Sequence, residues 1–171
     1  MTLVFQYGSN CTSARLNGPN RLNFGARDLG QAQTVDDFDI AFNFDSKANG
    51  CAASDLIEVP GRKAWGVLYR LSKADFERLK RDIEGPRYQE KPIRVVDQQG
   101  KKRNATTFVV REGERRQGLV TSAAYVSWIV YGLREHGVPE HWIAHVIEVA
   151  IETNKRAGAQ AEEQVRLIRT L

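Results

Sequence analysis

The chain has little of several residue types, and each shortage excludes a class of protein. Only Cys11 and Cys51 among its 171 residues are cysteines, too few for the disulfide framework of a small secreted domain. No stretch approaches the roughly 18 uncharged apolar residues of a membrane-spanning helix. Residues 1–7 are apolar but have no preceding positive charge and no small-residue cleavage site, so they predict a first strand rather than a signal peptide. We therefore expect a cytoplasmic protein with reduced thiols.

The composition that is present fits one globular domain spanning residues 1–171, with 42% hydrophobic and 27% charged residues. The net charge is +4, and the basic excess lies in residues 61–116, which carry 16 basic and 8 acidic residues. A surface for a polyanion, a site for a small acidic ligand and an ordinary solvated surface all fit this excess. The basic residues are interleaved with acidic ones and lack an aromatic stacking pattern, which favours the solvated surface.

The hydrophobic pattern predicts strands first and helices later. Strands are expected at residues 2–7, 35–44, 52–59, 64–71, 92–97 and 105–111, and helices after Ser72 and at 121–136, 139–156 and 161–168. Residues 17–32 are expected to form an irregular loop. The 35–44 strand alternates apolar and polar residues, which is typical of a half-buried strand. Gly66 suggests a bulge or a close approach by a ligand. This order indicates an α+β fold with a small closed or mixed sheet and helices packed on it.

The turn Tyr7-Gly8-Ser9-Asn10 follows the first strand. Its successive backbone N–H groups can point into one concavity and bind carboxylate or phosphate oxygens. An ordinary strand-to-helix connection, in which Asn10 caps a short helix over residues 14–16, fits the same residues.

Glu84 ends the predicted helix that begins after Ser72, just before Gly85-Pro86. The negative end of the helix dipole raises the pKa of a carboxyl, and burial raises it further. A carboxyl of raised pKa suits proton transfer near neutral pH. The alternative is a solvated glutamate at a frayed helix end.

Three further groups of residues are weaker candidates for chemistry. His141 and His145, with Glu148 and Glu152 on the same helix, have a spacing compatible with a metal site, but they lack the zinc hydrolase motif. Surface or core-edge histidines fit equally. Cys11 follows the polar turn, where a helix N-terminus can lower its pKa, yet no histidine lies near it in sequence. Residues 101–103 are typical of a charged hairpin tip.

Several segments together resemble the gamma-glutamylcyclotransferase family. Residues 5–10 (Phe-Gln-Tyr-Gly-Ser-Asn), with Arg15-Leu16 after them, resemble the N-terminal signature of that family. Residues 64–71 look like the family's strand before its catalytic helix, and Glu84-Gly85, Tyr88 and a strand at 93–96 follow. Tyr125, Gly132 and residues 137–139 occur at similar spacings, so the match covers roughly residues 3–140.

The resemblance implies a small mixed β-barrel with helices packed outside. It also implies an enzyme that converts the γ-glutamyl amide of an amino acid or amine into 5-oxoproline and a free amine. Glu84 is then the catalytic acid and base. The substrate-binding residues are then Tyr7, Gly8, Ser9, Asn10, Tyr88 and Tyr125.

No metal or nucleotide cofactor is required for this reaction, and the partner is a small γ-glutamyl compound rather than a nucleic acid or a membrane. The expected assembly is a monomer or a homodimer. Residues 85–88 are shorter and more polar than in many family members, which leaves the identity of the leaving amine open. Two other functions stay open: a non-catalytic β-barrel module that binds an anionic or nucleic-acid partner, and a hydrolase of related amides.

Overall fold

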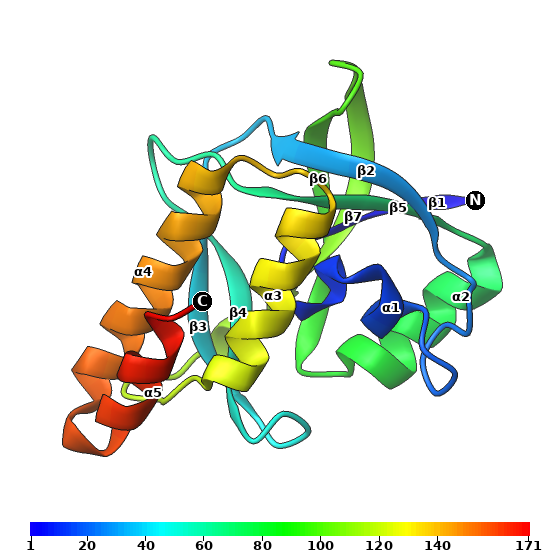
Figure 1. Cartoon of the computed structure of the whole chain (residues 1–171). Helices are drawn as coiled ribbons and strands as arrows, with labels where there is room; N and C mark the ends of the chain where they lie inside the picture. Colours follow the sequence, from blue (N-terminus) through cyan, green and yellow to red (C-terminus); the bar gives the residue numbers. More distant parts are fainter.

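A closed barrel of five strands forms one half of the molecule, and helices pack on the other half (Figure 1). These features come from a computed structural model that describes residues 1–171. The strands are β1 (Thr2–Gln6), β2 (Arg27–Thr34), β3 (Phe38–Ser46), β4 (Cys51–Glu58), β5 (Trp65–Leu71), β6 (Tyr88–Asp97) and β7 (Lys102–Val110). The helices are α1 (Ser13–Leu16), α2 (Lys73–Arg78), α3 (Ala123–Glu135), α4 (Glu140–Ala157) and α5 (Glu162–Ile168). Short 3-10 turns cover Ser9–Cys11, Glu112–Glu114 and Ala159–Ala161, and a π-helical segment covers Leu79–Glu84.

The barrel runs in the order β1-β5-β2-β6-β7 and closes where β7 pairs with β1. All its pairs are antiparallel except that last one, which is parallel and joins Val4 to Thr106. Closure leaves no unpaired sheet edge in the barrel. The α+β barrel with outside helices, predicted from the sequence, is therefore confirmed.

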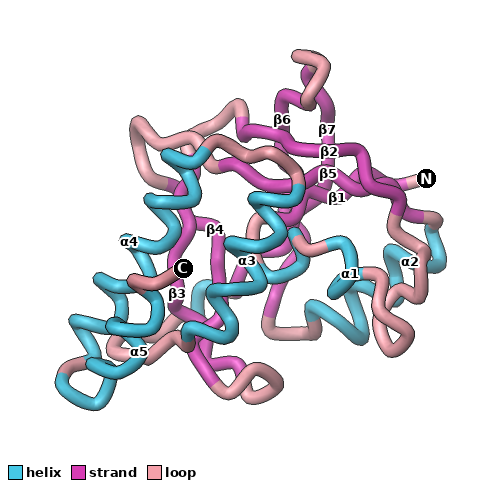
Figure 2. The backbone as a smooth tube through the Cα atoms, viewed as in Figure 1, coloured by secondary structure: helices cyan, strands magenta, loops and turns pink.

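Strands β3 and β4 form a separate two-stranded hairpin between the barrel and the helices (Figure 2). Helix α4 packs on β3, and β4 contacts β7 of the barrel. The buried carboxylate of Asp55 on β4 accepts hydrogen bonds from the Val110 N–H of β7 and from Arg115 Nε, both at 2.8 Å. The hairpin is thus fixed to both neighbouring layers.

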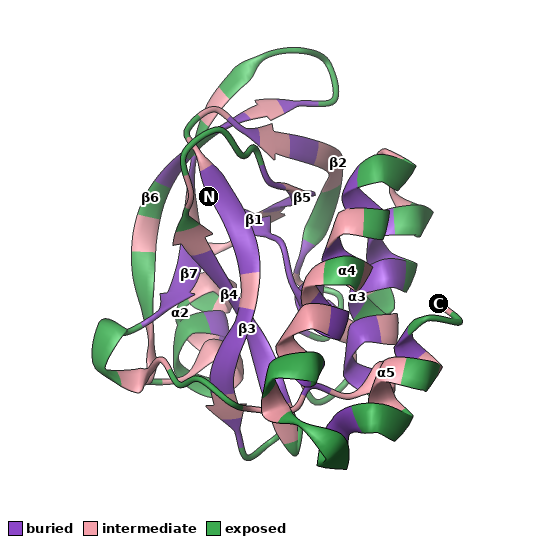
Figure 3. Ribbon diagram, turned by 90° about the vertical axis from the view of Figure 1, so that its left-hand side faces the viewer, coloured by how far each residue is buried: buried purple, intermediate pink, exposed green.

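The buried apolar side chains form one continuous cluster that runs from the barrel through the hairpin into the helical layer. Figure 3 shows the buried surfaces of the strands and the inward faces of α3 and α4 meeting there. No helix combines the length and the apolar character needed to cross a membrane.

Three predictions about the strands were wrong. Residues 17–32 were expected to be irregular, but β2 occupies Arg27–Thr34, so there are seven strands rather than six. The 35–44 strand is not half-buried: its polar residues Asp39 and Asn43 are also buried, because Asp39 binds His145 of α4 at 2.8 Å and Asn43 donates to the buried Asp55 carboxylate at 2.9 Å. At Gly66 the close neighbour is no ligand, since an added Cβ would meet the Gln6 carbonyl of β1 at 2.2 Å.

The predictions for the helices were accurate except at the first one. Ser72 caps α2 by accepting from the Asp75 N–H, Ser122 caps α3, and Gly137, with φ +68°, ends it. Asn10 does not cap α1. Thr12 occupies the N-cap position, and the Asn10 side chain points to Glu84 instead.

Candidate active site

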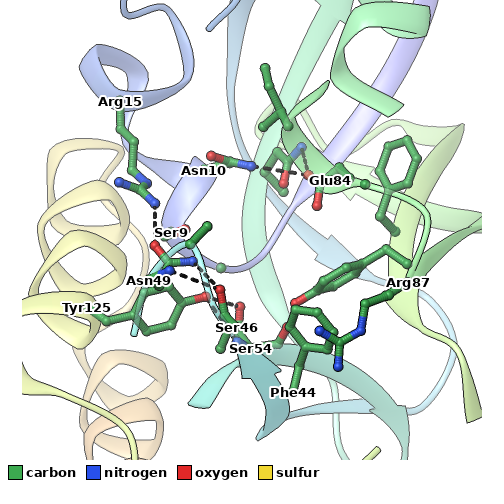
Figure 4. A pocket seen from close by; sticks show the side chains of 18 of the residues that line it. Ser9, Asn10, Arg15, Phe44, Ser46, Asn49, Ser54, Glu84, Arg87 and Tyr125 are labelled. Atoms are coloured by element: carbon green, nitrogen blue, oxygen red, sulfur yellow. Dashed lines mark hydrogen bonds between the residues drawn. The ribbon is translucent and has the colours of Figure 1, made fainter. Parts of the chain in front are cut away.

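A polar pocket of about 510 Å³ lies where the end of β1, the end of the π-helical segment and the β3–β4 hairpin meet (Figure 4). Every site residue predicted from the sequence lines it. These residues are Tyr7, Gly8, Ser9, Asn10, Glu84, Tyr88 and Tyr125. They come from segments up to 118 positions apart in the chain, so the fold, not local sequence, brings them together.

The Tyr7–Asn10 turn forms one wall of the pocket, and close packing against β4 fixes it. A Cβ on Gly8 would lie 2.2 Å from Ser54 Oγ, so a larger residue there would displace the Ser54 hydroxyl from its hydrogen bond with Tyr125. The Gly8 N–H makes no hydrogen bond within the protein. An unpaired backbone donor in a pocket is a binding position for an oxygen of a ligand.

Glu84 faces this turn from the opposite wall. Its Oε1 accepts hydrogen bonds from Asn10 Nδ2 at 3.1 Å and from Gln6 Nε2 at 3.3 Å. Its other oxygen, Oε2, has no partner within the protein and is therefore available to a ligand. Glu84 is half-buried at the end of the π-helical segment, where Gly85, with φ +82°, turns the chain away. The sequence alternative of a frayed, solvated glutamate does not apply.

Burial raises the pKa of the Glu84 carboxyl. The hydrogen bonds from Gln6 and Asn10 oppose this shift, as do the positive charges of Arg21 and Arg15. The pKa remains above the ordinary value, in the direction predicted, although desolvation is its principal cause. A carboxyl with a raised pKa is a stronger base than an ordinary one and can take up a proton from a bound ligand and return it.

Three tyrosines complete the inner part of the pocket, and their hydroxyls bind protein groups. Tyr7 donates to the Phe108 carbonyl at 2.6 Å, and Tyr88 donates to the Ser54 carbonyl at 2.7 Å. Tyr125 accepts from the Ser54 N–H at 3.0 Å and shares a second hydrogen bond with Ser54 Oγ. Burial raises the pKa of all three tyrosines, so they stay neutral.

Four cationic side chains also line the pocket: Arg15, Arg21, Lys47 and Arg87. Arg87 is paired with Glu114 at 2.9 Å, and Lys47 with Asp45 at 2.9 Å. In contrast, the buried Nε atoms of Arg15 and Arg21 have no partner. Of the basic residues in 61–116, only Arg87 lines the pocket. The two cations that have no carboxylate partner, Arg15 and Arg21, come from the first 60 residues of the chain.

Comparisons with known proteins agree with this architecture. Residues 63–146 match the AIG2-like family. The chain is 25% identical to the gamma-glutamylcyclotransferase of Mus musculus over 174 residues, which covers 98% of this chain and 87% of the relative. It is also 25% identical to the gamma-glutamylcyclotransferase of Homo sapiens, which covers 94% of this chain and 84% of the relative.

Solved structures show the same fold. A structure named gamma-glutamyl cyclotransferase superposes with a TM-score of 0.76 at 23% identity and covers 99% of both chains. A crystal structure of an uncharacterized human protein gives 0.76 at 24% identity and covers 98% of both chains. The chain is thus similar to gamma-glutamylcyclotransferases in sequence over most of its length and in fold. The resemblance seen in its sequence is thereby confirmed.

Three residues that line the pocket and contact the predicted site residues were not singled out from the sequence. Gln6 belongs to the 5–10 segment but was not predicted as a site residue, although a polar residue inside the apolar strand 2–7 indicates a specific contact. Arg21 lies in a segment that looked irregular, and Ser54 resembles any small strand residue. Only the folded arrangement reveals the contacts of Arg21 and Ser54.

The weaker candidates lie outside this site. Burial raises the pKa of the Cys11 thiol rather than lowering it, and the thiol donates to the Gln6 carbonyl at 3.1 Å. His145 binds the Asp39 carboxylate at 2.8 Å, and His141 is exposed. No three His, Cys, Asp or Glu side chains are grouped so that they can hold a metal ion.

Proposed function

We propose that the protein converts a γ-glutamyl amide into 5-oxoproline and a free amine. The observation that carries this proposal is the pairing of Glu84, whose pKa burial raises, with the unoccupied Gly8 N–H in one polar pocket. In this proposal Glu84 moves protons, and the Gly8 N–H binds a negatively charged oxygen. The similarity to proteins named gamma-glutamylcyclotransferase supports the same reaction class.

In the proposed reaction, Glu84 takes a proton from the α-ammonium group of the substrate. The freed amine attacks the γ-carbonyl carbon, a C–N bond forms and a five-membered ring closes. The bond from that carbon to the departing nitrogen then breaks, and the proton on Glu84 passes to that nitrogen. The ring nitrogen, which still carries a second proton, releases it to the freed amine, so that 5-oxoproline and an ammonium ion leave. One carboxylate thus serves as base and then as acid. The nucleophile and the carbonyl belong to one molecule, so the pocket has only to hold the folded conformer.

The Tyr7–Asn10 turn supplies the electrostatic part of this mechanism. The Gly8 N–H can hold either the γ-carbonyl oxygen, which gains negative charge during attack, or the α-carboxylate. The guanidinium groups of Arg15 and Arg21 bind side-chain amide oxygens and no carboxylate, so they give the pocket a positive potential that suits an anionic substrate.

Product analysis tests this function. Purified protein is incubated with γ-glutamyl amino acids, γ-glutamyl amines and a γ-glutamyl group on a larger carrier, and 5-oxoproline is measured. We expect 5-oxoproline from at least one class, and a loss of about a hundredfold or more in kcat for Glu84→Gln. Release of free glutamate would identify a hydrolase, and full turnover by Glu84→Gln would refute the proposed role of this residue.

The sequence also left open a non-catalytic module for an anionic or nucleic-acid partner. Affinity for a nucleic acid that falls steeply with salt, together with the absence of any 5-oxoproline, would favour that module. The cytoplasmic location, the single domain and the monomeric or dimeric state stay predictions of the sequence.

A further inference from the structure

Arg21 reaches the pocket from the loop between α1 and β2. Its guanidinium donates a hydrogen bond from Nη2 to Asn10 Oδ1. The other end of the same amide, Asn10 Nδ2, donates to Glu84 Oε1 at 3.1 Å. The three side chains therefore form a chain of contacts that ends on the candidate catalytic carboxylate (Figure 4 shows the Asn10–Glu84 contact).

The chemistry of these groups permits only one orientation of the Asn10 amide. A guanidinium has donors and no acceptor, so only Oδ1 of the amide can face it. A carboxylate has acceptors only, so only the NH₂ group can face Glu84. Glu84 and Arg21 therefore favour the same orientation from the two ends of the amide, and without Arg21 the Oδ1 end loses its charged partner.

Hydrogen bonds within the loop and a buried neighbouring residue hold the Arg21 backbone in place. The neighbouring Leu22 is buried in the core, and its N–H donates to the Leu16 carbonyl at 3.1 Å. The Arg21 N–H donates to the Gly18 carbonyl at 2.9 Å. Asn17 closes the loop by exchanging hydrogen bonds with both backbone groups of Ala26. The guanidinium is therefore carried by an ordered segment and not by a free surface loop.

We infer that Arg21 is a positioning residue: by binding Asn10 Oδ1, it fixes the Asn10 amide with its NH₂ group on Glu84. This inference rests on the proposed function for its catalytic consequence. The orientation itself follows from the contacts. A charged donor on Oδ1 also polarises the amide and strengthens the bond that its NH₂ group makes to Glu84.

Several other groups also act on Glu84, and a test of Arg21 has to separate its effect from theirs. Gln6 donates to the same carboxylate oxygen, and the charge of Arg15 acts on Glu84 from α1. Tyr7 and Tyr88 face it as neutral phenols. The direct charge of Arg21 also lowers the pKa of Glu84. A test must therefore distinguish an effect transmitted through Asn10 from the effect of charge alone.

The experiment follows the Glu84 carboxyl by its side-chain ¹³C signal as a function of pH, with the signal assigned from Glu84→Gln. This readout does not need an active enzyme. We expect Arg21→Met to raise the titration midpoint by about half a pH unit or more, and Arg21→Lys, which keeps a charged donor, to restore part of the shift. Arg27→Met removes an exposed arginine at the start of β2 and serves as the matched control.

A double-mutant cycle with Asn10→Ala identifies the route. If Arg21 acts through Asn10, Arg21→Met adds little to the titration shift in the Asn10→Ala background. An equal shift in both backgrounds, or no shift in Arg21→Met, would overturn the inference. In active protein, Arg21→Met should move the acidic limb of the kcat/KM profile to higher pH by the same amount. Absence of 5-oxoproline in the unmodified protein would refute the proposed function and leave the titration result to stand alone.

Discussion

At the scale of single residues, Glu84 is subject to opposing influences. Burial raises its pKa, while two side-chain amides and two guanidinium groups lower it. The first influence favours the protonated form of Glu84, and the second favours its carboxylate form. A substitution that exposes Glu84, or one that removes a lowering side chain, would change the pH at which Glu84 exchanges its proton.

The raised pKa of Glu84 leads to a prediction for stability. A carboxyl whose pKa is higher in the folded chain than in the unfolded chain destabilises the fold when it ionises. This loss is absent below the unfolded pKa, near 4.3, and grows as pH rises through the folded pKa. Glu84→Gln should therefore be more stable than the unmodified protein at pH 8 and equally stable near pH 3.5. Denaturant unfolding at both pH values measures the difference in unfolding free energy.

Asp82→Asn is a suitable control for this comparison, because Asp82 is exposed two positions earlier in the same segment. The pKa of Asp82 is lowered by its hydrogen bond with Arg81, so its substitution should not stabilise the protein at pH 8. A Glu84→Gln variant that is less stable than the unmodified protein at pH 8 would contradict the prediction.

Residue types and local spacing revealed part of the site. Local spacing made Glu84 and the Gly-Ser-Asn turn candidates, each beside an ordinary structural alternative. The resemblance to the gamma-glutamylcyclotransferase family then implied their roles. Arg21 was not accessible to sequence reasoning. Its partner Asn10 lies 11 positions away, across a loop that has no periodic pattern.

At the scale of the elements, the sequence predicted those whose signals are local. The caps at Ser72 and Ser122 and the glycine after α3 define helices within a few residues. Strand β2 was missed because residues 27–34 carry few apolar side chains and no alternation. It exists because β5 and β6 pair with it from either side, and such pairing depends on distant residues.

The β3–β4 hairpin depends on one buried carboxylate. Asp55 accepts hydrogen bonds from Asn43 Nδ2, Arg115 Nε and the Val110 N–H. In Asp55→Asn, an NH₂ group would face Asn43 and Arg115, which are donors themselves. We expect the unfolding free energy to fall by roughly 2–4 kcal/mol, measured by denaturant unfolding.

Asp45→Asn provides the comparison, because Asp45 lies on the same strand as Asn43 and its ion pair with Lys47 is exposed. Loss of such a pair changes stability by about 0.5 kcal/mol or less. If the two variants lose equal stability, Asp55 does not fix the hairpin to the barrel.

At the scale of the whole molecule, α3 connects the helical layer to the pocket. Thr12 Oγ1 donates to the Trp128 carbonyl at 2.6 Å, and the Ser13 N–H donates to Glu135 at 2.9 Å. Tyr125, on the same helix, reaches Ser54 on β4. One helix therefore sets the positions of the turn and of the hairpin together, which explains how segments distant in sequence form one site.

Gly132 is the point of closest contact in this arrangement. A Cβ there would lie 2.5 Å from the Thr12 N and 2.7 Å from the Cys11 carbonyl carbon, both of which are backbone atoms. Glycine to alanine within a helix normally adds about 1 kcal/mol of stability. Here the clash outweighs that gain, because α3 has to move away from the turn. We expect Gly132→Ala to lower the unfolding free energy by about 1–3 kcal/mol.

The same displacement should reach the pocket, because the residues that meet Gly132 directly follow the Tyr7–Asn10 turn. We expect Gly132→Ala to reduce kcat/KM for 5-oxoproline formation under conditions where the protein remains folded. Ser127→Ala, on the same helix away from the turn, should leave stability and turnover nearly unchanged. If Gly132→Ala proves as stable and as active as Ser127→Ala, the turn can shift without consequence, and α3 does not control the geometry of the pocket.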